Sequence, residues 1–233
     1  MTILGIDTAG RTMSVALLEN DTLLCEQTLA TGLTHSETLL PTVDAVLKAA
    51  GKTCADIDLF GVCAGPGSFT GLRIGLCAVK GLAFPANTPC AAVSTLEALA
   101  WSHAGTGTVV AAQDARRGEV YWAAFDLATH QRITPDTASP GEEIRTVAET
   151  CPKPLLFVGD GAYLCESAFS AVPGVLPCPA ALRAARAAGV CLAAKAMAER
   201  GETCPPAALL PSYHRLSQAE RQRAERLAQT TEG

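Results

Sequence analysis

Two stretches of the sequence follow one plan, and this repetition limits the architectures open to the chain. In "IDTAGRTMSVALLE" and "QDARRGEVYWAAFD", an aspartate (Asp7, Asp114) ends one apolar strand, a short turn follows, and a second apolar strand begins. Further along, "FGVCAGPG" and "LLFVGDGA" each carry a buried strand into glycines. Identities between the copies are few, so the repeat is a weak signal by itself. It indicates two lobes that begin alike.

Local patterns predict the elements of the first lobe. Short apolar runs separated by turn residues predict an antiparallel meander at 2–7, 13–19 and 22–30. Helices are expected at 34–50, at 70–84 and after Ser94, the first and third opened by the capping boxes "THSE" and "STLE". The expected order of elements is therefore β-β-β-α-β-α-β-α.

The loop of small residues "HAGTGT" marks the expected boundary between the lobes. We expect a first lobe at 1–105, a second at 106–216 and a polar helix or tail at 217–233. Within the second lobe, 135–141 reads as a loop and 180–200 as one alanine-rich helix.

Composition narrows the range of functions. The formal charge of −5 lacks the basic surplus that drives unaided binding to nucleic acid, so a nucleic-acid role needs a partner. The ten cysteines are spread singly with no CxxC pair, which indicates a reducing, cytoplasmic compartment. No uninterrupted apolar run approaches the roughly 18 residues of a membrane span, so we expect no membrane segment.

The motif "AGPGSFTGLRIG" raises the question of a phosphate-binding loop. A Walker A loop needs Gly-Lys where Thr70 and Gly71 stand, and a dinucleotide fingerprint needs glycine at Thr70. Strand, glycine loop and helix N-terminus still form a generic arrangement that can bind an anion. Ser68 lacks a GxSxG elbow and reads as a helix cap or turn residue.

Two helices carry a face of small residues. At about 100° per residue, one face of the helix at 70–84 consists of Gly71, Gly75, Ala78 and Leu82. The corresponding face of the helix at 34–50 consists of Thr38, Thr42, Ala45 and Ala49, with His35 near its edge. Such faces suit a helical interface with another chain; packing inside the same chain and an ordinary surface poor in charge remain alternatives.

Catalytic groups are sparse. The four histidines His35, His103, His130 and His214 are far apart in the sequence, and no spacing offers a metal site. Asp7 and Asp114 could each hold magnesium beside a phosphate, but without a partner carboxylate a turn role is favoured. Arg116 and Arg117 make the second turn the most favourable place for an anion.

The chain resembles the TsaB (YeaZ) family in "AGPGSFTGLRIG", "LGIDTA", "HSETLLP", "DARRGEVY", "GDGA" and "PSYHR". The resemblance implies an α/β, two-lobed fold of the actin, sugar kinase and Hsp70 type, each lobe a mixed sheet with helices. It implies a non-catalytic subunit in making threonylcarbamoyladenosine next to the tRNA anticodon. The partners it implies are the transferase TsaD and the ATPase TsaE, with tRNA contacted only through the complex.

The resemblance also assigns roles to residues. It places the contact with TsaD, or with a second copy of the chain, on the helices at 34–50 and 70–84. The HxxxH metal pair of the transferase is absent, since Leu39 stands four residues after His35. No cofactor or metal is expected, and "GDGA" departs from the fuller glycine motif of nucleotide-binding members. Relic cofactor positions would be Asp7, Gly65, Gly67, Asp114, Gly159 and Gly161. The alternative function is a small-molecule phosphotransferase that uses the cleft between the lobes.

Overall fold

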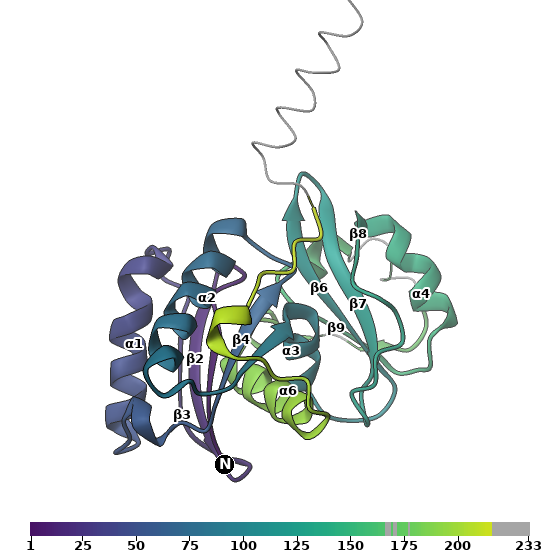
Figure 1. Ribbon diagram of the computed structural model, residues 1–233. Helices are drawn as coiled ribbons and strands as arrows, with labels where there is room; N and C mark the ends of the chain where they lie inside the picture. Colours follow the sequence, from purple (N-terminus) through teal and green to yellow (C-terminus); the bar gives the residue numbers. More distant parts are fainter. Residues whose placement is uncertain (166–168, 170–171, 177, 216–233) are drawn as a thin grey trace, which may run out of the picture.

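A computed structural model describes residues 1–165, 169, 172–176 and 178–215, and the elements below lie in these ranges. Two five-stranded sheets stand side by side, each with helices packed on it (Figure 1). The first half of the chain forms β1 Thr2–Asp7, β2 Met13–Glu19, β3 Thr22–Leu29, α1 His35–Ala49, β4 Leu59–Gly65, α2 Phe69–Ala83, β5 Cys90–Ser94 and α3 Thr95–Trp101. The second half forms β6 Thr108–Arg116, β7 Glu119–Asp126, β8 Thr137–Pro140, α4 Ile144–Thr150, β9 Leu155–Val158, β10 Val175–Leu176 and α6 Ala187–Glu199.

The two sheets have the same topology. Their strand orders are β3-β2-β1-β4-β5 and, read from the other edge, β8-β7-β6-β9-β10. In each sheet the first two strands pair antiparallel and the central strand pairs parallel with the strand after the crossover. The repeat that the sequence suggested is therefore confirmed in the fold, and so is the mixed character of both sheets.

The predicted order of the first lobe is also confirmed, because its elements follow as β-β-β-α-β-α-β-α. The strands β1 and β4 are buried along their whole length, as expected for central strands covered on both faces. Helices α1 and α2 cover one face of the first sheet, and α6 and α3 cover the other. Helix α3 also contacts β6 and β7, so it lies between the two sheets.

Helix α6 packs on the first sheet although it falls within the range that the sequence assigned to the second lobe. Its buried residues Val190, Cys191 and Ala194 belong to the core of the first lobe. A Cβ on Gly5 would lie 2.6 Å from the Cys191 Sγ, and one on Gly61 would lie 2.8 Å from the Ala194 Cβ. Two strand glycines thus let an alanine-rich helix approach the sheet closely, and the chain returns to the first lobe near its end.

Three local predictions were wrong. Thr34 precedes α1 in an extended conformation, but its side chain makes no capping hydrogen bond; the expected cap does form at Ser94, whose Oγ accepts from the Glu97 N–H at 3.4 Å. The stretch 135–141 contains β8, an edge strand, where Pro140 is tolerated. The helix expected at 180–200 begins only at Ala187. The predicted tail at 217–233 lies outside the described residues.

One helical segment, Phe69–Ala86, is long and apolar enough to cross a membrane by length and composition alone, which the sequence reading did not anticipate. It carries Arg73 and Lys80, and the buried side of α2 packs against β4 and β1. A helix in the core of a globular fold meets the same criteria, so the segment is weak evidence for a membrane span.

Residues 200–215, which follow α6, form a segment that connects the two lobes, and we call it the strap. The backbone of Cys204 forms an antiparallel β-bridge with Cys90 in the edge strand β5. Leu209 is buried in the core of the first lobe. The Ser212 N–H then donates to the Ala64 carbonyl at 2.7 Å, and the Arg215 Nη1 donates to the Ala115 carbonyl at 3.0 Å. The strap therefore runs from the glycine loop of one lobe to the β6–β7 turn of the other.

Candidate binding cleft between the lobes

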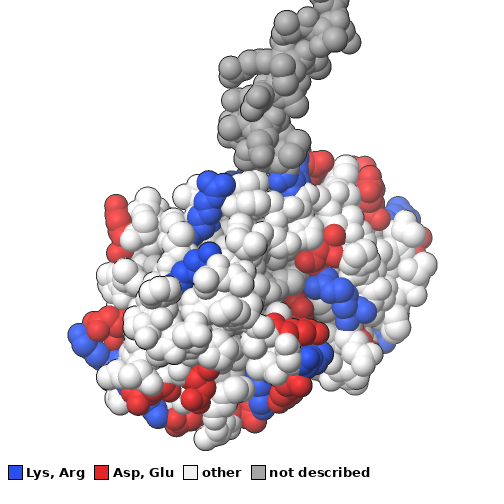
Figure 2. Space-filling model, in the orientation of Figure 1, with Lys and Arg blue, Asp and Glu red and all other residues white. Residues whose placement is uncertain are grey.

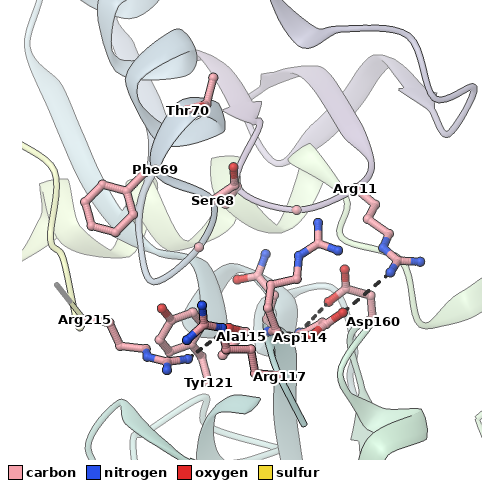
Figure 3. A pocket seen from close by; sticks show the side chains of 15 residues that line it. Arg11, Ser68, Phe69, Thr70, Asp114, Ala115, Arg117, Tyr121, Asp160 and Arg215 are labelled. Carbon is pink, nitrogen blue, oxygen red and sulfur yellow. Dashed lines mark hydrogen bonds and ion pairs between the residues drawn. The ribbon is translucent and has the colours of Figure 1, made fainter. Parts of the chain in front are cut away.

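A cleft of about 400 Å³ lies where the turns of the two lobes face each other (Figure 3). We call it the inter-lobe cleft; its lining is Ala9, Gly10, Arg11, Gly67, Ser68, Phe69, Thr70, Gln113, Asp114, Ala115, Arg116, Arg117, Tyr121, Asp160 and Arg215. These residues come from the β1–β2 turn, the start of α2, the β6–β7 turn, the loop after β9 and the strap. A second cavity of about 280 Å³ adjoins it and shares Gly10, Arg11, Gln113 and Asp160.

The two strand-ending aspartates both close turns. The Asp7 Oδ1 accepts the Ala9 N–H at 2.8 Å, and the Asp114 Oδ1 accepts the Arg116 N–H at 2.7 Å. The favoured turn role is therefore confirmed for both. They differ in burial, because Asp7 lies beneath the surface and Asp114 lines the cleft.

Asp7 has an unusual environment for a carboxyl group. It is 1% exposed, and its Oδ2 has no nitrogen or oxygen partner, although the Cys63 thiol interacts with the carboxyl group. Burial raises the pKa of Asp7 to about 6, although the hydrogen bond from Ala9 opposes the shift. Asp7 is therefore partly protonated near neutral pH.

Asp160 was missed by the sequence reading, which found no partner carboxylate for Asp114. Its Oδ1 accepts the Asp114 N–H at 3.0 Å, and the Arg11 guanidinium lies 3.6 Å from the Asp114 Oδ2. Burial raises the pKa of Asp160, and the charge of Asp114 adds to the shift. The aspartate between the glycines of "GDGA" was the available signal.

The glycines at 65, 67, 159 and 161 allow close contacts within the chain. A Cβ on Gly65 would lie 2.1 Å from the Ser212 carbonyl oxygen, and one on Gly67 would lie 2.7 Å from the Ala9 carbonyl oxygen. In the second lobe, Gly159 and Gly161 approach the backbone of Ala112 and Gln113 in the same way. These four positions thus hold turns and strap together; none of them needs a phosphate to explain it.

The glycine face of α2 is also occupied from inside. A Cβ on Gly71 would lie 2.1 Å from the Thr8 carbonyl oxygen, and one on Gly75 would lie 2.4 Å from the Thr8 Oγ1. The Thr8 Oγ1 donates to the Gly71 carbonyl at 2.7 Å. The interpretation of Gly71 and Gly75 as room for another chain was therefore wrong, because the β1–β2 turn fills that space.

The other residues of the predicted interface are divided between surface and core. Ala45 and Ala49 are exposed on α1, whereas Thr42 is buried and its Oγ1 donates to the Thr38 carbonyl. The remaining members His35, Thr38, Ala78 and Leu82 are half-buried. Leu33 and Leu40 are 59% and 54% exposed, but Leu40 lies on the opposite side of α1 from Ala49. Figure 2 shows uncharged surface over α1 and α2, interrupted by basic groups over α2 and by charged groups at the outer edge of α1.

The histidines do not form a metal site. The His35 Nε2 lies 3.0 Å from the Gly10 carbonyl oxygen, and the His130 Nε2 lies 2.9 Å from the His103 carbonyl oxygen. Burial lowers the pKa of His103. Across the described part of the chain, no group of three or more His, Cys, Asp or Glu residues could hold a metal ion. Ser68 caps α2 as predicted, its Oγ accepting the Gly71 N–H at 3.3 Å.

Comparisons with known proteins show similarity to proteins described as acting in tRNA modification. Residues 30–222 match the family model described as TsaD, tRNA N6-adenosine threonylcarbamoyltransferase. The chain is 43% identical to the tRNA threonylcarbamoyladenosine biosynthesis protein TsaB of Escherichia coli over 54% of this chain and 55% of that protein. It is 34% identical to the Bacillus subtilis protein of the same name over 70% of this chain and 73% of that protein. The match thus spans about half of the length of the first relative.

Solved structures show the same likeness at the level of the fold. A Pseudomonas aeruginosa protein described as similar to the peptidase YeaZ superposes with a TM-score of 0.76 at 30% identity, covering 92% of this chain and 99% of that one. A hexokinase of the ROK type from Thermus thermophilus superposes with a TM-score of 0.50 at 10% identity, covering 86% of this chain and 100% of that one. The second likeness concerns the fold alone and confirms the actin and sugar kinase type of architecture.

Proposed function

Because the chain belongs to the TsaB (YeaZ) family, we propose that it is a non-catalytic subunit in tRNA threonylcarbamoyladenosine biosynthesis. In this proposal it acts in the cytoplasm, binds and activates the transferase TsaD, and is joined there by the ATPase TsaE. The family model of the transferase matches most of the chain, while the described residues offer no metal-binding group. A paralogue that keeps the fold without the catalytic metal site is suited to a supporting role.

The observation that carries the proposal is the outer surface of α1 and α2. Ala45, Ala49 and Cys77 are exposed there. Leu40 is excluded, because at about 100° per residue it lies on the opposite side of α1 from Ala49, beyond the charged side chains of Asp44 and Lys48. Small and apolar exposed residues on two adjacent helices favour close packing with helices of another protein. Gly71 and Gly75 are excluded from this surface, since Thr8 covers them. A homodimer would use the same surface and compete with TsaD.

Reconstitution tests the proposed role directly. Modification of tRNA is measured with TsaD and TsaE, with and without this chain, and we expect product only when it is present. Equal product without the chain would remove the proposed activating role.

Single substitutions test the surface. Ala45→Arg and Ala49→Arg place a charge within the proposed contact, and we expect each to weaken TsaD binding by about 2 kcal/mol or more, roughly thirtyfold. Ala128→Arg is the matched control, because Ala128 is equally exposed but lies in a turn of the second lobe. Gel filtration and titration with TsaD read out the binding. If the α1 variants bind like the control, the surface is wrong.

The alternative, a small-molecule phosphotransferase, is favoured by one observation: the buried Oδ2 of Asp7 beneath the inter-lobe cleft, which has no nitrogen or oxygen partner. The closure of Gly65 and Gly67 onto the chain's own backbone counts against it, because the space beside them is filled by Ser212 and Ala9. Calorimetry with ATP and magnesium separates the two functions. Tight binding that Asp7→Asn abolishes would favour the phosphotransferase, and we expect none.

A further inference from the structure

Four arginines border the inter-lobe cleft, and two of them have no opposite charge bound to them. Arg11 lies 3.6 Å from Asp114, and Arg215 pairs with Glu119. For Arg116 and Arg117, the described residues provide no ion pair within 4 Å and no side-chain hydrogen bond, and both side chains are exposed, although the charge of Arg116 acts on Asp160. Guanidinium groups bind phosphate in a bidentate manner, so the side chains of Arg116 and Arg117 can each donate two hydrogen bonds to an anion.

The backbone of this turn is held in an unfavourable conformation. Arg116 and Arg117 have φ of 67° and 60°, in the left-handed region that costs a residue with a Cβ roughly 1–2 kcal/mol. Arg116 pairs with Glu119, so Arg117 and Gly118 form the two-residue loop of the β6–β7 hairpin. Asparagine or glycine is preferred at such positions. Arginine at both is locally unfavourable, and residues of this kind gather at functional sites.

The inner wall of the cleft carries hydrogen-bond acceptors, whereas its rim carries arginine side chains. Gln113 is 4% exposed, lines the cleft, and its Oε1 has no hydrogen-bond partner. Asp160 and Asp114 lie beside it, and Figure 3 shows both carboxylates between Arg11 and the group of Arg117 and Arg215. The inner wall therefore offers hydrogen-bond acceptors to groups that donate, such as hydroxyl and amino groups.

We propose that the inter-lobe cleft binds one nucleotide unit of single-stranded RNA, with ribose hydroxyl and base amino groups against Gln113 and Asp160 and phosphates on Arg116 and Arg117. The volume of about 400 Å³ suits one such unit. Phe69 lies in its wall, with one face of its ring stacked on Tyr213 at 4.2 Å. Acceptors inside and guanidinium groups outside match a nucleotide that enters sugar first. The choice of RNA over a free nucleotide rests on the proposed function in tRNA modification. It departs from the expectation that RNA is reached only through a partner, because Arg116 and Arg117 supply local positive charge that the chain as a whole lacks.

The test uses the full chain and a fluorescein-labelled single-stranded RNA of about 10 nucleotides. Fluorescence anisotropy gives the binding constant over a series of salt concentrations. The variant Arg116→Asn/Arg117→Asn removes two charges, and asparagine accepts the left-handed backbone. Arg145→Gln/Arg200→Gln is the control: it removes the same charge from two exposed arginines outside the cleft.

Each phosphate contact contributes about 0.7 to the slope of log K against log salt for a single strand. We therefore expect the slope of the cleft variant to fall by about 1.4, so that wild type loses about sevenfold more affinity than the variant when salt rises fourfold. The control should keep the wild-type slope. Equal slopes for cleft variant and control, or no RNA binding by wild type at low salt, would overturn the proposal.

Adenosine monophosphate as competitor separates the two sources of the ligand. If it binds as tightly as the RNA, the cleft takes a free nucleotide and the RNA assignment is wrong. The reconstitution assay remains independent: a chain that supports tRNA modification but fails in anisotropy keeps its proposed function and loses only this site.

Discussion

Replacing Gly71 by alanine tests whether the glycine face of α2 is filled from inside the chain. The new Cβ would lie 2.1 Å from the Thr8 carbonyl oxygen, a backbone atom that cannot rotate away. Relieving this contact requires the β1–β2 turn to move, and the hydrogen bond from the Thr8 Oγ1 to the Gly71 carbonyl would weaken with it.

The expected magnitude follows from three contributions. Overpacking costs about 1–3 kcal/mol, the hydrogen bond contributes about 1 kcal/mol, and alanine in a helix gains about 1 kcal/mol over glycine. The free energy of unfolding should therefore fall by about 2 kcal/mol, which corresponds to a decrease of about 4–8 °C in Tm for a chain of this size.

Gly81→Ala provides the matched control in the same helix. Nothing lies within 4 Å of a Cβ at Gly81, so only the gain in helix propensity remains. We expect this variant to be more stable than wild type by about 0.5–1 kcal/mol. Urea unfolding followed by circular dichroism measures both variants. If Gly71→Ala is as stable as Gly81→Ala, the glycine faces open space and our account of α2 is refuted.

Further predictions concern other parts of the molecule. Asp7→Asn should stabilise the chain above pH 6 by on the order of 2–3 kcal/mol. The pKa of Asp7 in the folded chain, about 6, exceeds the usual value of 3.8, so ionising the buried carboxyl group lowers stability as pH rises between these values. In urea titrations the gain should disappear below about pH 4. Arg117→Asn should raise the free energy of unfolding by about 0.5–1 kcal/mol, since asparagine suits the turn before Gly118; a less stable variant would contradict the strain argument. Of the ten cysteines, only Cys77 is exposed, so an aromatic disulfide reagent should modify one thiol rapidly, and Cys77→Ser should remove that phase. Bound TsaD should protect Cys77 if the proposed α1–α2 surface is correct.

The sequence by itself determined the features that depend on neighbouring residues. Apolar runs, turn residues and the cap at Ser68 act over a few positions, and they predicted the order of the first lobe and the turn roles of Asp7 and Asp114. The resemblance to TsaB rested on short motifs of the same kind. It predicted the two-lobed fold that the comparisons confirm.

The candidate site was predictable only in part. The β6–β7 turn with Arg116 and Arg117 was recognised from its charge, but Asp160 and Arg215 join the cleft from segments far away in the sequence. Arg215 reaches it because the strap returns across the glycine loop. No local pattern records such a path.

Only the tertiary structure decided what each glycine is for. A missing side chain predicts that something approaches closely, and the helical pattern of α2 allowed either another protein or the chain itself to be that neighbour. The fold places Thr8 against Gly71 and α6 against Gly5. Close packing is a contact between distant parts of the chain, whereas propensity and periodicity act locally, and this is why the sequence predicted the elements and the tertiary structure assigned their partners.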